Sequence, residues 1–186
     1  MGKLVVILGS TGSGKGVLIQ HIREVRPDFL YPRSCTTREM RAGEIDGDQY
    51  FFLAKEEFER RIAAGDFLEW AHFGENLYGS LKSEILLPLQ EGKTLLLELD
   101  VQGVRSLQKM IPSEQIITIF VDAGSWAELE RRVRARAPIS DSELAKRKKR
   151  YEDEVTFKDE ATHVVVNATG KLDEAKREID AIINAL

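Results

Sequence analysis

The segment LGSTGSGKGV, residues 8–17, decides the fold of this 186-residue chain. It follows the apolar run Leu4–Ile7 directly, and its residues Gly9–Lys15 fit the pattern G-x-x-x-x-G-K. Glycines at these positions let successive backbone N–H groups turn inward onto an anion. The positive end of the following helix adds to that field, and Lys15 reaches the outer phosphates. The segment therefore predicts a phosphate-binding loop between a strand and a helix. The alternative, a plain glycine-rich turn, leaves the lysine and its spacing without a reason.

Gly16 stands where such loops normally carry the serine or threonine that contacts Mg²⁺. We therefore expect Mg²⁺, the predicted cofactor, to be held by nucleotide phosphates, water and an acidic residue at the end of another strand. Glu98 and Asp100 follow the apolar run in TLLLELD, residues 94–100, at the end of a predicted strand, where the crevice of a parallel sheet lies. They are the candidate metal ligands, directly or through water. Asp100 could equally cap a helix that begins near Gln102, and the two roles can coexist.

Further along the chain, apolar runs alternate with amphipathic stretches. The runs, typical of strands buried on both faces, are Leu4–Leu8, Thr94–Leu99, Ile116–Val121 and His163–Val166. The amphipathic stretches, which predict helices, are Val17–Val25, Ser83–Gln90, Gln102–Met110, Trp126–Val133 and Leu172–Leu186. This alternation predicts an α/β fold with a doubly wound parallel sheet behind the phosphate loop.

Two regions depart from the alternation. Residues 32–81 contain EIDGDQYFFL (44–53) and FLEWAHFGENLYGS (67–80), which predict turns and strands of a small mixed-β insertion. Residues 126–159 predict two basic helices that form a lid over the sheet. Their junction is Ala137-Pro138-Ile139-Ser140, in which Pro138 disfavours continued helix and Ser140 is a candidate N-cap. The core is then made of residues 1–31, 82–125 and 160–186.

Composition narrows the class of protein. The chain is 42% hydrophobic and 31% charged, with a formal net charge of −4, which argues against a nucleic-acid partner. Cys35 is the single cysteine, so an intramolecular disulfide is excluded. The apolar N-terminal stretch is too short for a signal peptide or a membrane span, so we expect a cytoplasmic protein without a membrane partner. The sequence does not determine the oligomeric state.

Four further motifs carry a resemblance. RSCTTREMRAGEIDGDQYFF (33–52), EW (69–70), YGS (78–80) and LELDVQG (97–103) occur together with the phosphate loop. In order and approximate spacing the chain, from Leu4 to at least Asn167, resembles the guanylate kinase family, whose members transfer the γ-phosphoryl group of ATP to GMP. The resemblance implies an insertion that binds the nucleoside monophosphate. Its residues for the GMP phosphate would be Arg38, Arg41, Tyr50 and Tyr78, and those for the guanine base Ser34, Glu69, Ser80 and Asp100.

The residue types suit that assignment. Two arginines offer forked, charge-assisted donors to a phosphate dianion, and tyrosine hydroxyls complete its oxygens. Guanine presents two donors, N1–H and the exocyclic amine, which a carboxylate such as Glu69 can accept, whereas a serine hydroxyl can donate to O6. Adenine would place an acceptor opposite Glu69. GMP, and with it dGMP, is therefore expected over AMP.

On the ATP side, the resemblance implies that lid arginines contact the triphosphate. The ATP-binding residues would be Gly9, Ser10, Thr11, Gly12, Ser13, Gly14, Lys15, Gly16, Val17, Arg132, Arg136 and Asn167. Phosphoryl transfer needs positioning and cations more than a protein nucleophile. The groups expected to carry this chemistry are Lys15, Arg38, Arg136 and Arg147. His21, His72 and His163 have no metal-ligand spacing and are interpreted as structural.

Two departures from the family leave an alternative open. Besides Gly16, the lid turn normally reads Gly-Thr-Asp-Ser, and here it is Ala137-Pro138-Ile139-Ser140. The two departures, at Gly16 and in the lid turn, predict a working but slow kinase, or else a catalytically impaired module that binds a nucleotide or a phosphopeptide. Lys15 and the lid arginines favour the enzyme. A third reading, a ribose-phosphate kinase of similar fold, gives Glu69 and Ser34 no guanine to contact.

Overall fold

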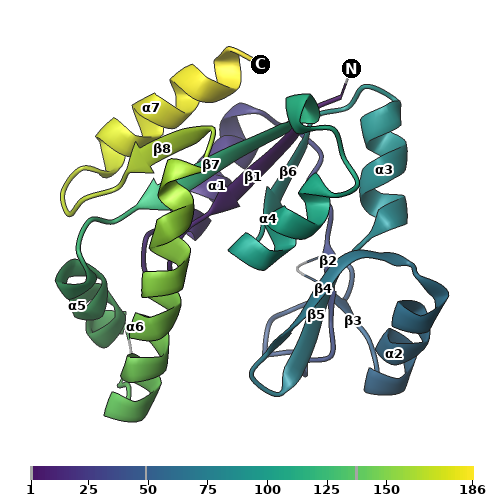
Figure 1. Ribbon diagram of the computed structural model, residues 1–186, viewed down its shortest axis with the longest axis horizontal. Coiled ribbons are helices and arrows are strands. Elements are labelled where there is room, and N and C mark those ends of the chain that lie inside the picture. Colours follow the sequence, from purple (N-terminus) through teal and green to yellow (C-terminus); the bar gives the residue numbers. More distant parts are fainter. Residues whose placement is uncertain (1, 49, 137) are drawn as a thin grey trace. The chain divides into compact units, whose positions relative to one another are not determined.

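The computed structural model describes residues 2–48, 50–136 and 138–186 (Figure 1). Four strands form the main sheet in the order β6-β1-β7-β8, and β7 pairs with β8 in parallel. Their bounds are β1 Leu4–Leu8, β6 Leu95–Glu98, β7 Ile116–Asp122 and β8 His163–Val166. Each of the four apolar runs is a strand, and two have the predicted limits. The predicted α/β fold with a parallel sheet is thereby confirmed.

Each helix that the amphipathic stretches predict is present, with ends shifted by a few residues. The bounds are α1 Lys15–Val25, α3 Lys82–Gln90, α4 Val101–Gln108, α5 Trp126–Arg136 and α7 Leu172–Asn184. Helix α6, Asp141–Val155, is the second of the two helices predicted for the lid. Helix α1 begins at Lys15, because Gly14 takes a left-handed conformation with φ of 92° at the N-cap position. The phosphate loop therefore runs straight into the helix N-terminus. None of the described helices is long and apolar enough to span a membrane.

The chain divides into two compact units. The first unit comprises Met1–Leu4, Phe29–Leu97 and Gln102–Ile116. The second unit comprises Val5–Asp28, Glu98–Val101 and Ile117–Leu186. The predicted insertion, residues 32–81, lies within the first unit, and the predicted lid, residues 126–159, lies within the second. The candidate residues for GMP other than Asp100 thus belong to the first unit, and those for ATP belong to the second.

A mixed sheet organises the insertion. Its strands β2 Ser34–Thr36, β3 Phe51–Phe52, β4 Phe67–Phe73 and β5 Asn76–Leu81 lie in the order β3-β2-β5-β4. β2 pairs with β3 in parallel, and the other two pairs are antiparallel. Because side chains alternate along a strand, Leu77 and Leu81 of β5 face the apolar core, whereas Tyr78 and Ser80 face the opposite side.

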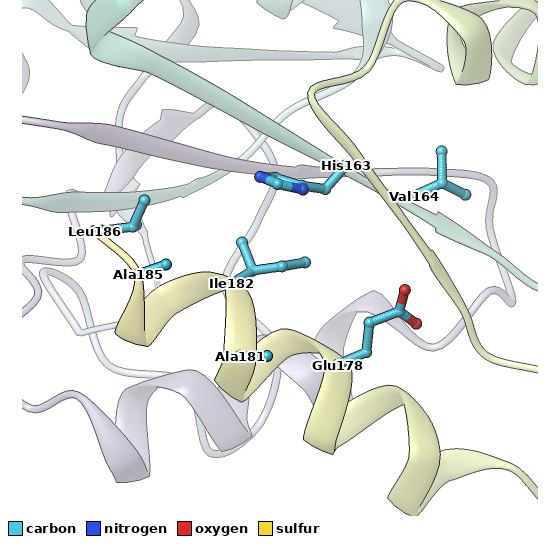
Figure 2. A pocket seen from close by; sticks show the side chains of 7 residues that line it. All are labelled: His163, Val164, Glu178, Ala181, Ile182, Ala185 and Leu186. Carbon is cyan, nitrogen blue, oxygen red and sulfur yellow. The ribbon is translucent and has the colours of Figure 1, made fainter.

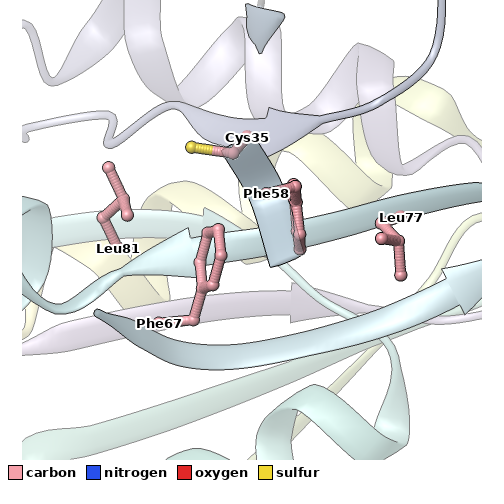
Figure 3. Packing of buried hydrophobic residues seen from close by; sticks show 5 residues of the cluster. All are labelled: Cys35, Phe58, Phe67, Leu77 and Leu81. Atoms are coloured by element: carbon pink, nitrogen blue, oxygen red, sulfur yellow. The ribbon is translucent and has the colours of Figure 1, made fainter. Parts of the chain in front are cut away.

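Helix α2, Lys55–Ala64, corrects the sequence interpretation, which described residues 32–81 only as turns and strands. Phe58 of α2 is fully buried and stacks on Phe67 with 4.3 Å between ring centroids. Figure 3 shows Phe58 and Phe67 together with Cys35, Leu77 and Leu81, the buried cluster of this unit. The helix covers the apolar face of the mixed sheet. Tyr78 and Ser80 lie on the opposite face.

The core of the second unit lies around β1 and β7, whose residues are all buried. Leu18 and Ile22 of α1 and Ile179 and Ile183 of α7 are also fully buried, and the two helices contact each other. Buried apolar contacts on this scale give rigidity to the strand end from which the phosphate loop starts.

Ser140 caps helix α6, as predicted: its hydroxyl accepts a hydrogen bond from the Glu143 N–H at 3.3 Å. Ala137 of the same predicted turn lies outside the described residues. We expect Ser140→Ala to lower the free energy of unfolding by about 1 kcal/mol, because one N-terminal N–H of the helix loses its acceptor. Urea denaturation followed by circular dichroism measures this change. Ser83→Ala, at an exposed position in α3, is the control, and an equal effect of both substitutions would contradict the cap.

Candidate active site

Three glycines shape the loop between β1 and α1. Gly9, Gly12 and Gly14 have φ of 136°, 92° and 92°, a region in which side-chain-bearing residues are strained. Space is short as well, since a Cβ atom on Gly9 would lie 2.5 Å from the Val121 carbonyl oxygen, and one on Gly14 would collide with the Asn167 side chain. The loop backbone can therefore adopt this conformation only with glycine at these positions.

Two serine hydroxyls of the loop lack the partners that buried polar groups normally have. Ser10 and Ser13 are 5% and 1% exposed. Neither Oγ atom forms a hydrogen bond of ordinary length with any residue that the structure describes. A buried hydroxyl without a partner costs free energy, and for Ser13 a bound anion with several acceptor oxygens removes that cost. The loop thus fits a phosphate group.

Lys15 lies across the loop. Its Nζ atom donates to the carbonyl oxygens of Gly9 at 2.5 Å and Ser10 at 3.3 Å, and it lies 3.7 Å from the Glu98 carboxylate. The lysine side chain is only 14% exposed, whereas that of Glu98 is 44% exposed. The ammonium group is therefore held at the loop by neutral acceptors and one distant acid, and a phosphate can replace these contacts.

The acidic candidates Glu98 and Asp100 could supply only some of the ligands of a metal ion, and the others would come from the nucleotide and water. Within residues 2–48, 50–136 and 138–186 no group of three His, Cys, Asp or Glu side chains could hold a metal ion by itself. Glu98 ends β6, and Asp100 directly precedes α4. Mg²⁺ is bound in nucleotide enzymes through one or two carboxylates, phosphate oxygens and water. The donor set fits such a nucleotide-borne Mg²⁺.

Arg132 and Asn167 meet beside the phosphate loop. The Arg132 guanidinium donates to the Asn167 carbonyl oxygen at 2.8 Å, to that of Gly12 at 3.4 Å and to the Glu128 carboxylate at 2.7 Å. The Asn167 side-chain amide donates to the Ser13 carbonyl oxygen at 2.8 Å. Two predicted ATP residues from distant parts of the chain are thus brought to the loop. Glu128, which sequence reasoning missed, orients the arginine.

The two lid helices contact each other and form a small pocket next to the loop. The Trp126 and Tyr151 rings lie 5.7 Å apart, and the Tyr151 hydroxyl donates to the Gly124 carbonyl oxygen at 3.3 Å. The pocket is lined by Ser10, Thr11, Trp126, Val133, Arg147, Arg150, Tyr151 and Glu154. Arg147 of the predicted cations lines this pocket. Arg136, exposed at the end of α5, does not.

In the first unit, strand register brings three predicted guanine residues into one row. Ser34 of β2 lies opposite Ser80 of β5, which lies opposite Glu69 of β4. The Ser80 hydroxyl donates to the Glu69 carboxylate at 2.7 Å. Directly opposed residues point to the same face of a sheet, so the row forms a patch of two hydroxyls and a carboxylate. The remaining candidate, Asp100, belongs to the second unit.

The predicted phosphate residues of the first unit also cluster. Arg38 lies 5.8 Å from the Tyr50 ring centroid, and the Tyr50 and Tyr78 rings are 5.9 Å apart. The Arg38 guanidinium also lies over Phe52, at 5.4 Å from the centroid. Arg41 is exposed. The Arg38 guanidinium and the two tyrosine hydroxyls can together offer hydrogen-bond donors to several oxygens of a phosphate dianion.

Glu44 holds this cluster in place and was not predicted. Its two carboxylate oxygens accept hydrogen bonds from the Arg38 guanidinium at 2.8 and 2.9 Å, and one also accepts from the Arg41 backbone N–H at 2.7 Å. These bonds, that from Arg38 foremost, lower the pKa of Glu44 to about 2. The contribution of the Glu44–Arg38 pair to the free energy of unfolding is thus fully present above the ordinary pKa of glutamate, and it is lost as the pH falls toward 2. The sequence signal that could have indicated this role is the position of Glu44, which follows Arg38 and Arg41 and precedes Tyr50.

A separate groove lies between α7 and β8 in the second unit. It has a volume of about 430 Å³ and is lined by His163, Val164, Glu178, Ala181, Ile182, Ala185 and Leu186. Figure 2 shows the His163 ring near Ile182, with the Glu178 carboxylate farther along the helix. Its lining is mainly apolar and has no arginine or lysine, so it does not suit a phosphate. None of the predicted site residues lies in it.

Comparison with known proteins extends over nearly the whole chain. A family model described as guanylate kinase matches residues 1–186. A guanylate kinase of Synechococcus elongatus is 37% identical over 183 residues, 98% of each chain. One of Caldanaerobacter subterraneus is 38% identical and covers 99% of this chain and 87% of the relative. The crystal structure of a guanylate kinase from Anaplasma phagocytophilum matches with a TM-score of 0.76 at 27% identity, over 99% of this chain and 85% of that one.

Proposed function

The chain belongs to the guanylate kinase family, and we propose that it transfers the γ-phosphoryl group of ATP to GMP, giving ADP and GDP, with dGMP as a second acceptor. The observation that carries the proposal is the row Ser34, Ser80 and Glu69 beside the cluster of Arg38, Tyr50 and Tyr78. The first group offers the acceptor and donors that a guanine edge requires, and the second offers cations and hydroxyls for its phosphate.

In this proposal the acceptor nucleotide is read by one carboxylate. Glu69 accepts from guanine N1–H and the exocyclic amine, and Ser34 and Ser80 supply hydroxyls for the remaining base atoms. Ser80 already donates to Glu69, which fixes the carboxylate for its ligand. Arg38 and Arg41, with Tyr50 and Tyr78, bind the phosphate. Glu44 keeps the Arg38 fork oriented while the site is empty of nucleotide.

The donor nucleotide binds at the phosphate loop. Backbone N–H groups of Gly9–Gly14 and the N-terminus of α1 receive the β-phosphate, and Lys15 exchanges its carbonyl contacts for phosphate oxygens. Arg132 and Asn167 lie beside the loop to contact the rest of ATP. Glu98 and Asp100 would hold Mg²⁺, directly or through water. When bound, Mg²⁺ neutralises phosphate charge and orients the triphosphate.

The transfer itself requires no protein nucleophile. An oxygen of the GMP phosphate forms a bond to the γ-phosphorus while the bond to the β–γ bridging oxygen breaks, so that ADP leaves in line with the attack. Charge builds on the transferred oxygens and is stabilised by Lys15, Arg38, Arg136 and Arg147. Excluding water from the donor phosphate prevents hydrolysis of ATP in place of transfer.

The test is an ADP-release assay with ATP and Mg²⁺ in which GMP, dGMP, AMP, CMP and UMP are compared as acceptors. The proposal expects turnover with GMP and dGMP and only the background rate with the other three. A second candidate, a module that binds GMP without catalysis, is favoured by Gly16 and the altered lid turn. Saturable GMP binding by calorimetry with no ADP release would establish that module and overturn the kinase.

The open space at Gly16 gives a further prediction. A Cβ atom built on Gly16 meets no atom within 4 Å, so a serine fits there without displacing its surroundings. We expect Gly16→Ser to raise turnover about fivefold or to lower the Mg²⁺ concentration for half-maximal rate by that factor, because one hydroxyl contact contributes about 1 kcal/mol. Gly16→Ala, which fills the same space without an oxygen, is the matched control. Equal rates for both variants would show that no hydroxyl is missing.

A further inference from the structure

Glu154 is an acidic side chain at the phosphate loop that the proposed transfer does not use. It lies in the last turn of α6, is only partly exposed, and lines the small pocket together with Ser10 and Thr11. A carboxylate beside a phosphate site opposes anion binding unless it has another task there. A carboxylate at this position therefore needs an explanation.

The neighbour that defines this task is Ser10. Its Oγ atom is buried, and among the described residues no hydrogen bond of ordinary length satisfies it. Glu154 of α6 lines the same pocket as Ser10. Burial raises the pKa of the Glu154 carboxyl, the nearby Ser10 hydroxyl and the charges of Lys15 and Arg150 lower it, and the charge of Asp100 raises it. The buried Ser10 hydroxyl thus lacks an acceptor in a pocket that a partly buried carboxylate also lines.

Helix α6 connects Glu154 to the lid cations. Arg147, Arg150, Tyr151 and Glu154 all line the pocket, and their positions i, i+3, i+4 and i+7 place them on one face of the helix. Arg147 and Glu154 are seven residues apart, about 10 Å along the axis. Tyr151 between them packs on Trp126 and donates to the Gly124 carbonyl oxygen. If Glu154 is held at the loop, the rest of this helix face is held too, and the position of Arg147 relative to the phosphate loop is thereby determined.

We propose that Glu154 is a positioning residue: it accepts a hydrogen bond from the Ser10 hydroxyl and so sets the register of α6, with Arg147, on the phosphate loop. The inference rests on the proposed function, because Arg147 acts on the transferred phosphoryl group. Glu154 itself touches neither substrate. It links the predicted lid to the loop in a chain whose lid turn differs from that of its family.

A double-mutant cycle tests the contact. Glu154→Gln and Ser10→Ala are each expected to lower kcat about tenfold, the order of one charge-assisted hydrogen bond, and to leave the KM for GMP unchanged. The double variant is expected to be no slower than either single variant, because both remove one interaction. Glu152→Gln, with the same charge change on an exposed residue of the same helix, is the control and is expected to behave as wild type.

A second readout does not depend on turnover. Trp126 lines the pocket, and Trp70, the other tryptophan, is replaced by phenylalanine so that Trp126 alone reports. Addition of a non-hydrolysable ATP analogue is expected to change Trp126 fluorescence in the Trp70→Phe protein, and this change is expected to be reduced alike by Glu154→Gln and by Ser10→Ala. Calorimetry with the same analogue gives its Kd.

Additive effects of the two substitutions, or a Glu154→Gln variant indistinguishable from Glu152→Gln, would overturn the proposal. If Glu154→Gln fails to fold, Glu154→Asp, which keeps the charge but draws the carboxylate back by one methylene, takes its place in the cycle with Ser10→Ala. Absence of GMP-dependent turnover in the wild-type protein would instead refute the proposed function. The fluorescence and calorimetric cycle would still report on the contact.

Discussion

Replacing Lys15 with alanine is expected to lower GMP-dependent turnover about 10³-fold, the loss typical of removing one group that stabilises developing charge. The Lys15 ammonium is held at the loop by the Gly9 and Ser10 carbonyl oxygens and lies 3.7 Å from Glu98. Without it, the donor phosphates meet the Ser13 hydroxyl and backbone N–H groups but no charge within the loop. Initial rates at saturating ATP and GMP measure the effect.

The control for this prediction is Lys171→Ala, which removes a lysine that is 55% exposed and pairs with Glu174. It is expected to retain the wild-type rate. Circular dichroism and thermal unfolding of Lys15→Ala show whether the loop variant is folded. A folded Lys15→Ala protein with a rate within threefold of wild type would mean that this loop does not bind the reacting phosphates.

Replacing Glu69 with glutamine is expected to raise the KM for GMP about 30- to 150-fold, which corresponds to about 2–3 kcal/mol for hydrogen bonds to a charged acceptor. An amide oxygen accepts more weakly than a carboxylate, and the amide nitrogen adds a donor opposite the donors of guanine. The same change removes the clash of polarity with adenine. The ratio of kcat/KM for GMP to that for AMP is therefore expected to fall more than the KM change alone accounts for.

Glu75→Gln provides the matched control, since Glu75 is exposed in the turn between β4 and β5 and makes the same change of charge six residues away. Kinetics with GMP and AMP are measured on both variants. An unchanged KM for GMP in Glu69→Gln would remove the carboxylate from the base site. The row of Ser34, Ser80 and Glu69 would then be a feature of the sheet alone.

The parallel sheet could be predicted because its strands are short apolar runs, of which β1 and β7 are wholly buried, whereas in β8 only Val165 is buried. Continuous apolar runs such as Leu4–Leu8 and His163–Val166 signal such strands directly, and their limits were correct. Helix α2 was missed because its apolar face is narrow. Phe58 is its one fully buried residue, and among charged neighbours the spacing to Ile62 gave a weak periodic signal. Packing against the mixed sheet, rather than local pattern, stabilises this helix.

The candidate site was predictable where its residues lie in a motif. The loop Gly9–Lys15 could be identified from its own sequence. The row of Ser34, Ser80 and Glu69 depends on the register between three strands, which the pattern of a single strand does not show. Glu44, Glu128 and Glu154 were missed for a common reason: each acts on another side chain. Their roles depend on the positions of Arg38, Arg132 and Ser10, which only the folded chain defines.

Transfer of a labelled phosphoryl group tests the central claim most directly. The protein is incubated with ATP labelled at the γ-phosphorus, Mg²⁺ and GMP, and the nucleotides are separated by chromatography. The label is expected to appear in GDP at the rate at which ADP is released, with little in inorganic phosphate. Label found in inorganic phosphate and not in GDP would show hydrolysis of ATP without transfer, and would contradict the assignment of the first unit's polar residues to a phosphoryl acceptor.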